Sequence, residues 1–369
     1  MNPTNKTRFG ILIVNLGTPN SPKTPDVRKY LREFLMDGRV IDIPLIPRWM
    51  LVNMIIAPFR APKSAKIYQK VWTENGSPLK IYGIETEKML QESLNSEEYV
   101  VRLAMRYQNP SIDSILKEFE KMNLEKIVVI PLFPQYASAS SGSVHQKVME
   151  IISHWQIIPE VVLVRQFFDN PLFIKAFAEI GKEYLKKESY DHYIFTYHGL
   201  PERQIRKGDC SNTCLKNTKT PNEANCCATY GIQNIGCYRA QCFETTRLLA
   251  SAMGLKAEDC STTFQSRLGK DPWIKPYTDD VIKTFPAKNK KRILAFSPSF
   301  VADCLETTIE IGEEYKELFE EVGGEHWQLV ESLNKNPIWI EMLHKMVLEH
   351  TTPQVGLDKM LQVIAEEKI

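Results

Sequence analysis

One histidine in this sequence stands where a side chain could handle protons or a metal ion. His198 ends an apolar run in the segment FTYHGLPER. A histidine at the end of a strand can act as a base, as a metal ligand or as both, because its usual pKa lies near neutral pH. It can equally be a structural histidine held by hydrogen bonds, and its position alone leaves both interpretations open.

A row of acidic residues is the second feature with chemical potential. The segment from Asp303 to Glu314 reads DCLETTIEIGEE, and Glu306, Glu310 and either Glu313 or Glu314 recur at helical spacing. Asp303 followed by Glu306 resembles a capping box, which is a purely structural use of these residues. Capping gives no reason for acids beyond the first turn. The row is therefore also a candidate path for protons or for a hard cation.

The third feature is a concentration of cysteines. The chain has eight, and six of them lie between Cys210 and Cys242, in an insert that spans 208–242. We find no export signal near the start, so a disulfide framework is not expected. This clustering favours a metal site or an iron–sulfur site.

Short apolar runs rich in branched residues must position these groups. They alternate with longer helical patterns and cover 10–17, 100–106, 126–133, 161–167, 192–198, 261–265, 292–298 and 327–332. Continuous apolar runs separated by helices are typical of parallel strands that are buried on both faces. We therefore predict an α/β fold with two similar Rossmann-like domains, each a four-stranded parallel sheet flanked by helices.

The two halves of the sequence look alike. In each, the fourth apolar run is followed by Asn-Pro and a new periodic segment, at Asn170-Pro171 and at Asn336-Pro337, which predicts a helix cap and first turn. We expect domains at 1–167 and 168–369. Ligands of parallel sheets bind at the carboxyl ends of the strands. Two facing domains would thus direct these loops, including His198, into one cleft.

An apolar segment interrupted by prolines spans about residues 34–68. It could be a buried hairpin, or an exposed lip for a flat, greasy ligand or a membrane surface. Arg60, Lys63, Lys66 and Tyr68 at its end would suit carboxylates of such a ligand.

Composition excludes other classes of function. The 369 residues are 43% hydrophobic and 25% charged, with a net charge of +1, so nothing favours nucleic-acid binding. The most apolar stretch, 49–59, is about half the length that a membrane-spanning helix needs. We expect no transmembrane segment and a cytoplasmic location.

Taken together, these segments resemble the ferrochelatases. The similarity rests on ILIVNLGTP (11–19), PKSAKIYQKVW and GSPL (62–79), RYQNP (106–110), FPQYASASSGS (133–143), HGLPER (198–203), TTFQSRLGKDPW (262–273) and FVADCLETTIEIGEEY (300–315). The resemblance implies a chelatase fold and insertion of Fe²⁺ into protoporphyrin IX, with release of two protons and formation of haem b. Porphyrin and ferrous iron would be the substrates, and the apolar segment would be the lip of the active site.

The resemblance also implies roles for single residues. His198 and Glu306 would be catalytic and would contact the iron, with Glu310 and Glu314 as a relay. Porphyrin-binding positions would be Arg60, Tyr68, Ser77, Arg106, Tyr107, Tyr136 and Trp273.

The chain departs from the family at two places. Many members carry a histidine two residues before the glutamate, where this chain has Cys304. Animal-type members hold a 2Fe–2S cluster with one cysteine in the FPQY loop and three in a C-terminal extension. Those cysteines are missing here, since Ser138 stands in the loop and no cysteine follows Cys304. Some bacterial members carry a 2Fe–2S cluster on an internal segment, and the insert could hold one. Zinc and free thiols are the alternatives. The expected ligands are Cys214, Cys227, Cys237 and Cys242.

Three alternative functions remain open at this stage. A close variant would use coproporphyrin, and a related chelatase would load cobalt or nickel into another tetrapyrrole. A haem- or metal-binding carrier on the same scaffold would need no proton acceptor, so His198 and Glu306 argue against it. Peripheral contact with a membrane through the lip is compatible with each.

Overall fold

The computed structural model describes residues 7–210, 214–215, 225–269 and 271–352. Within these ranges the strands are β1 (Phe9–Gly17), β2 (Tyr99–Tyr107), β3 (Lys126–Pro131), β4 (Glu160–Leu163), β5 (His192–His198), β6 (Cys260–Gln265), β7 (Arg292–Phe296) and β8 (His326–Leu329). All eight predicted strands are present. The fourth and eighth end earlier than expected, although Val164 and Val330 still donate one further hydrogen bond each to the neighbouring strand.

The strands form two parallel sheets of the same topology in the described part of the chain. The order is β2-β1-β3-β4 in the first sheet and β6-β5-β7-β8 in the second. The first strand of each half therefore lies inside its sheet, and its residues Ile11 and Ile194 are fully buried. The predicted fold class is confirmed, and the repeated topology explains why the two halves of the sequence look alike.

Helices cover both sheets. In the first half they are α1 (Thr24–Met36), α2 (Leu45–Met50), the π-helix η1 (Leu51–Ile56), α3 (Ala57–Val71), α4 (Pro78–Ser93), α5 (Ile112–Glu120) and α6 (Ser141–Ile152). In the second half they are α7 (Pro171–Lys187), α8 (Glu202–Lys207), η3 (Asn225–Cys227), α9 (Tyr238–Met253), η4 (Ala257–Asp259), α10 (Thr278–Ile282), η5 (Pro286–Lys288), the π-helix η6 (Glu306–Glu314), α11 (Tyr315–Glu321) and α12 (Pro337–Thr351).

The two predicted Asn-Pro caps begin α7 and α12. The side chain of Asn170 accepts a hydrogen bond from the N–H of Leu172, and that of Asn336 accepts one from Ile338, both at 2.9 Å. Each cap satisfies one otherwise free donor of the first turn and contributes about 1 kcal/mol to stability.

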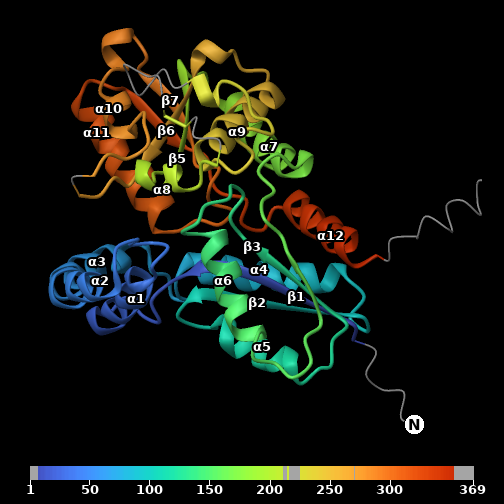
Figure 1. The fold of residues 1–369 in the computed structure, drawn as a ribbon. Coiled ribbons are helices and arrows are strands. Elements are labelled where there is room, and N and C mark those ends of the chain that lie inside the picture. The colour runs from blue at the N-terminus through green and yellow to red at the C-terminus, as the bar shows by residue number, and fades with distance from the viewer. Residues whose placement is uncertain (1–6, 211–213, 216–224, 270, 353–369) are drawn as a thin grey trace, which may run out of the picture.

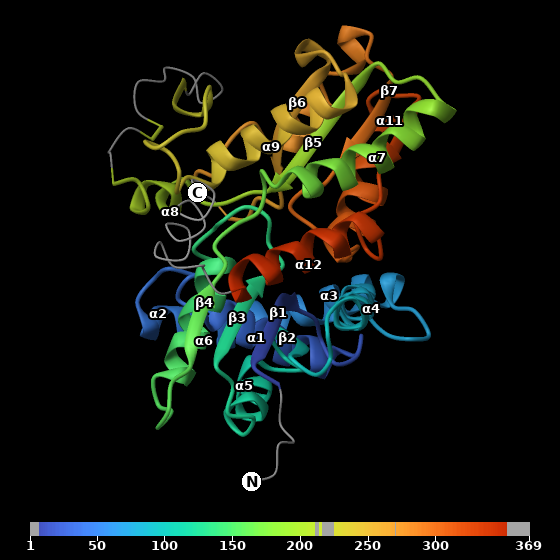
Figure 2. The ribbon, with the colours of Figure 1, turned by 90° about the vertical axis from the view of Figure 1, so that its right-hand side faces the viewer.

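The last helix of the described residues, α12, joins the two halves. In both views α12 lies between the sheets (Figures 1 and 2), where it packs against α7 of the second half and against α4 and β3 of the first. Its residues Trp339, Met342 and Leu343 are buried in a core that also contains residues of both sheets. Helix α12 therefore helps to hold the halves face to face.

The apolar segment of the first half is helical, and it is exposed. Helices α2, η1 and the start of α3 run consecutively, and their outward side chains Leu45, Ile46, Trp49, Met50, Met54, Ile55 and Phe59 are each more than half exposed. We call these seven residues the lip. The prediction of an exposed lip is thus confirmed over that of a buried hairpin. No described helix is long and apolar enough to cross a membrane.

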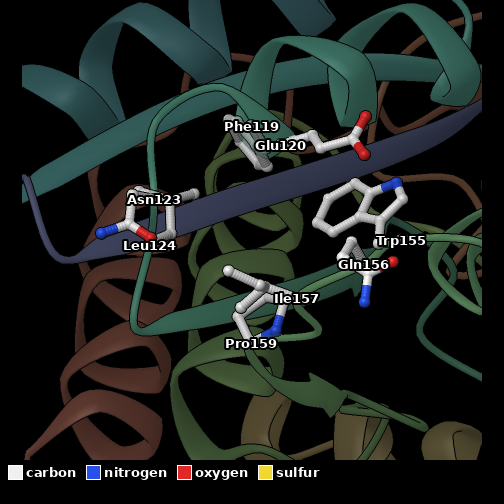
Figure 3. A pocket seen from close by; sticks show the side chains of 8 residues that line it. All are labelled: Phe119, Glu120, Asn123, Leu124, Trp155, Gln156, Ile157 and Pro159. Carbon is white, nitrogen blue, oxygen red and sulfur yellow. The ribbon is translucent and has the colours of Figure 1, made fainter.

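One hollow lies away from the strand ends. It has a volume of about 190 Å³ and is bounded by the end of α5, the turn before β3 and the segment before β4 (Figure 3). Trp155, Phe119 and Leu124 form its apolar wall. The sequence motifs do not involve these residues.

Candidate active site

His198 lies at the carboxyl end of β5, as predicted. Its register partner on β6 is Gln265, and the N–H of Gly199 donates to the carbonyl of Gln265 at 2.9 Å. A Cβ on residue 199 would lie 2.7 Å from that carbonyl oxygen and 3.0 Å from Trp273, so only glycine fits here. The HGLP motif therefore lets the chain turn sharply after His198 while staying bonded to β6.

Four neighbours fix the position of His198. Its Nδ1 lies 2.7 Å from the carbonyl oxygen of Gly199, and its ring lies 6.4 Å from that of Trp273. Its own carbonyl accepts a hydrogen bond from the hydroxyl of Tyr238, at 2.9 Å, and its N–H donates to Ser299 at 3.4 Å. The bond between Nδ1 and a carbonyl oxygen requires a proton on Nδ1. It therefore leaves Nε2 as the nitrogen that can accept a proton or bind a metal.

Helix η6 carries the acidic row, and Glu310 anchors it to β6. The carboxylate of Glu310 accepts hydrogen bonds from the N–H and hydroxyl of Ser266, from Gln265 and from the hydroxyl of Tyr315. Because Gln265 is the register partner of His198, this anchor ties η6 to the strand next to the histidine. The sequence had predicted Glu310 as a relay, and the structure also gives it a positioning contact.

Glu306 begins η6 and meets the first half of the molecule. Its charge acts on Tyr68 of α3, whose pKa is raised by burial and then by Glu306. Arg60, about two turns earlier on α3, is exposed, and its positive charge acts to lower the pKa of Tyr68. Tyr68 is hydrogen-bonded to Tyr30, a buried residue of α1 that the sequence analysis missed. Tyr68 of the first half and Glu306 of the second half, both predicted site residues, thus lie close to each other.

A second contact runs along the same two helices. Lys70 of α3 lies 3.3 Å from the carboxylate of Glu313 on η6. Burial, and then the nearby charge of Glu310, raise the pKa of Glu314. The acidic row of η6 therefore begins next to Tyr68 and continues beside α3 to exposed positions. Both η1 and η6 are π-helical, a form that is enriched at functional sites.

Cys304 replaces the histidine that many ferrochelatases have before the glutamate. Its side chain is buried, and burial raises the pKa of its thiol well above the usual value. The charge of Glu306 acts in the same direction. A neutral, buried thiol is a poor base, so at this position the chain offers a small hydrophobic group in place of a titrating imidazole.

Arg106 and Tyr107, predicted at the macrocycle, are engaged with a residue that the sequence analysis missed. Asp37 lies 2.7 Å from Arg106 and accepts a hydrogen bond from the hydroxyl of Tyr107 at 2.8 Å. Ser143 accepts from Arg106 at 2.7 Å and also bonds Asp37. The carboxylate of Asp37, at the end of α1, thus links the end of β2 to the first turn of α6. Tyr107 is fully buried.

The remaining predicted positions lie in the same region of the fold. Ser77 is buried at the start of α4 and accepts a hydrogen bond from Thr18 at 3.0 Å. Tyr136 is partly exposed, and its N–H donates to Gln241 of α9 at 2.7 Å, which links the halves. The guanidinium of Arg165 stacks on its ring. Trp273 is buried beside His198.

The cysteine insert returns to the core at the start of α9. The thiols of Cys214 and Cys237 lie 3.8 Å apart, and those of Cys226 and Cys227 lie 3.9 Å apart. Contacts between Cys214 and Cys226 and between Cys227 and Cys237 close the set, which we call the thiol cluster. The described cysteines are all free. Contacts with Cys214 and then Cys227 lower the pKa of the Cys226 thiol.

Three of the four expected ligands belong to the thiol cluster, and the fourth does not. Cys242 is buried one turn into α9, where its thiol contacts Tyr238. Cys226, which the sequence analysis passed over in favour of its neighbour, is the fourth member of the thiol cluster. The described residues do not already form a ready-made set of three or more metal ligands. The four sulfurs are gathered in contacting pairs and would have to open around a metal.

Two facing α/β halves, with a histidine at a strand end and a row of carboxylates at the seam between them, define a chelatase. Comparison with known proteins agrees. A family model described as ferrochelatase matches residues 8–351. The chain belongs to the ferrochelatase family.

Particular relatives extend this result. The chain is 45% identical over 342 residues to a ferrochelatase of Legionella pneumophila (strain Paris), covering 93% of this chain and 99% of that protein. It is 39% identical over the same length to a ferrochelatase of Coxiella burnetii (strain Dugway 5J108-111), of which it covers 94%. Among solved structures, the sirohydrochlorin chelatase SirB from Bacillus subtilis subspecies spizizenii in complex with cobalt matches with a TM-score of 0.53 at 11% identity, covering 95% of this chain and 98% of that one. This last likeness concerns the fold.

Proposed function

We propose that this protein inserts Fe²⁺ into protoporphyrin IX, forming haem b and releasing two protons. Membership of the ferrochelatase family supports the reaction. The observation that carries the assignment of residues is the meeting of Glu306 and Tyr68, from opposite halves, on a helix that Glu310 anchors to the register partner of His198. A porphyrin between these residues would have a base or ligand on one side and a carboxylate on the other.

The chemistry requires groups of this kind. A planar porphyrin shields its nitrogens, and both pyrrole N–H groups must lose their protons before the metal is held. Binding contacts remote from the nitrogens can supply the few kcal/mol that ring distortion costs. In this proposal, Nε2 of His198 accepts a pyrrole proton or contacts the iron. Glu306 takes up the other proton or delivers the cation, and Glu310 and Glu314 continue its path.

Turnover under anaerobic conditions tests this proposal. We would measure insertion of Fe²⁺ into protoporphyrin IX and coproporphyrin III side by side. His198→Ala and Glu306→Gln should each remove most of the activity and leave porphyrin binding intact. Insertion at the wild-type rate by His198→Ala would contradict the assignment. Preference for coproporphyrin III would keep the reaction and change the substrate, and retention of haem without turnover would indicate a carrier.

We also propose that the thiol cluster holds a 2Fe–2S cluster, with Cys214, Cys226, Cys227 and Cys237 as ligands. Four sulfurs linked by pairwise contacts are the kind of donors that such a cluster or a structural zinc takes. A 2Fe–2S cluster at these thiols would transfer single electrons, or it would serve as a cross-link between the insert and α9. None of the described cysteines forms a disulfide, which suits a reducing compartment such as the cytoplasm. Anaerobically purified protein should be coloured, with about two irons and two sulfides per chain. Colourless protein with one zinc would contradict the cluster.

The lip is proposed to touch a membrane surface. Its seven apolar side chains lie on consecutive helices and are exposed together, which is unusual for a surface that meets only water. Trp49→Ser with Phe59→Ser should reduce co-sedimentation with phosphatidylglycerol vesicles, whereas Ile157→Ser, an exposed residue far along the chain, should not. Equal sedimentation of all three proteins would refute the membrane contact.

A further inference from the structure

Arg239 is a buried positive charge for which the described residues provide no carboxylate. It is the second residue of α9 and is only 2% exposed. Its Nε donates to the carbonyl of Lys275 at 3.1 Å, its guanidinium lies 4.5 Å from the ring centre of Phe243, and its Nη1 has no hydrogen-bond partner. A buried ion without a counter-ion costs several kcal/mol. Such a residue therefore points to an anion nearby.

The thiols are the anionic groups within its reach. Arg239 lies close enough for its charge to act on Cys226, Cys227 and Cys242. Cys237 is the cap residue directly before α9, beside the otherwise free N–H groups of the first turn. The positive end of a 16-residue helix thus lies beside Cys237, and the charge of the buried guanidinium acts on Cys226 and Cys227 of the same thiol cluster.

The charge of a four-thiolate centre matches this surplus. Four thiolates around Zn²⁺, or around two ferric ions and two sulfides, both give a dianion. We propose that Arg239 is the internal counter-cation of a dianionic centre held by Cys214, Cys226, Cys227 and Cys237. This inference rests on the thiolate centre of the proposed function, and it adds the residue that makes such a centre stable inside the protein.

The geometry favours arginine for this task. Stacking on Phe243 and the bond to the Lys275 carbonyl fix the plane of the guanidinium and leave one Nη free to donate. Hydrogen bonds and positive charge near the sulfurs are among the features that set the reduction potential of iron–sulfur centres. Because the reduced cluster carries one more negative charge, Arg239 should stabilise the reduced form and raise the potential.

Two measurements on the anaerobically purified full chain test the inference. The first is the rate at which metal is lost to excess EDTA, which reports on either a cluster or zinc. Loss of an outer-shell partner typically costs about 10- to 100-fold in metal affinity, so Arg239→Gln should release metal at least about tenfold faster than wild type. Arg239→Lys, which keeps the charge, should lie between the two. The second is the midpoint potential from an EPR-monitored dithionite titration, which Arg239→Gln should make more negative.

A matched variant controls for the loss of any guanidinium. Arg267 also stacks on a ring, that of Tyr277, but Asp279 lies 3.5 Å away as its partner. Arg267→Gln should leave both measurements at their wild-type values. Thermal midpoints would show that each variant is folded. Wild-type metal retention and potential in folded Arg239→Gln would overturn this inference alone. Wild-type protein that binds neither iron nor zinc at these thiols would overturn it together with the thiolate centre.

Discussion

The hydroxyl of Tyr238 donates a hydrogen bond to the main-chain carbonyl of His198, at 2.9 Å. Tyr238 directly follows Cys237, so the thiol cluster and the contact that fixes the candidate catalytic histidine involve adjacent residues. Tyr238 is buried, and its hydroxyl is also close to Ser299. The start of α9 therefore holds the end of β5 in place.

Tyr238→Phe should reduce kcat severalfold with little change in the KM for porphyrin. The substitution leaves the carbonyl of His198 without its partner and loosens the strand end, at a cost of about 1 kcal/mol in stability. Tyr197→Phe is the matched control, because Tyr197 is a buried neighbour whose hydroxyl bonds Thr246 at 2.9 Å. It should lose similar stability and keep its kcat. Equal kcat values for the two variants would contradict a positioning role for Tyr238.

Glu310→Gln should destabilise the fold more than Glu314→Gln. Glu310 accepts from Ser266, Gln265 and Tyr315, and hydrogen bonds to a charged acceptor are each worth about 1.5–3 kcal/mol. Glu314 is exposed and should cost under about 0.5 kcal/mol. Urea unfolding of both variants measures this difference. If Glu314→Gln proves the less stable protein, the anchoring of η6 through Glu310 is wrong.

Tyr30→Phe should raise the KM for porphyrin by about two- to fivefold, as expected for a lost hydrogen bond of about 0.5–1 kcal/mol. Its hydroxyl supports Tyr68, which faces Glu306 across the two halves. Stacking on Phe34 is kept by the new ring. Tyr99→Phe removes a buried hydroxyl that bonds Thr351, far from this site, and serves as the control. A KM that rises equally in both variants would argue for a general loss of stability.

The protein should lose stability as the pH falls from about 6.5 toward 4, partly through His192. Burial, and then the charge of Lys290, lower the pKa of His192 to about 3. Between this value and the usual value near 6.5, the unfolded chain binds the proton and the folded chain does not, so the free energy of unfolding decreases on acidification.

His192→Gln should remove about 3 kcal/mol of that acid-dependent loss, since one pKa unit corresponds to about 1.4 kcal/mol. Urea midpoints measured at several pH values give the comparison. His344→Gln, which replaces a partly exposed histidine, should keep the wild-type slope. An unchanged slope in His192→Gln would show that His192 does not cause the acid sensitivity.

Local pattern determined much of this protein from the sequence alone. Apolar runs and Asn-Pro caps specified the strands, the start of α7 and α12, and the repeat, because burial and capping act over a few neighbouring residues. The rule that ligands meet the carboxyl ends of parallel strands placed His198. The family motifs selected Glu306 and its row. The domain boundary at 167–168 stays a prediction, since α12 packs on both halves.

Partners distant in sequence were decided only by the tertiary structure. Asp37 joins Arg106 and Tyr107 across about seventy positions, and nothing in the local pattern around Asp37 announces this. Cys242 lies outside the thiol cluster because its side chain contacts Tyr238 within α9, whereas Cys226 contacts Cys227. Likewise, only the folded structure shows that Arg239 is buried and that its Nη1 lacks a hydrogen-bond partner. Spacing specifies which residues share an element, whereas the packing of separate elements decides which side chains meet.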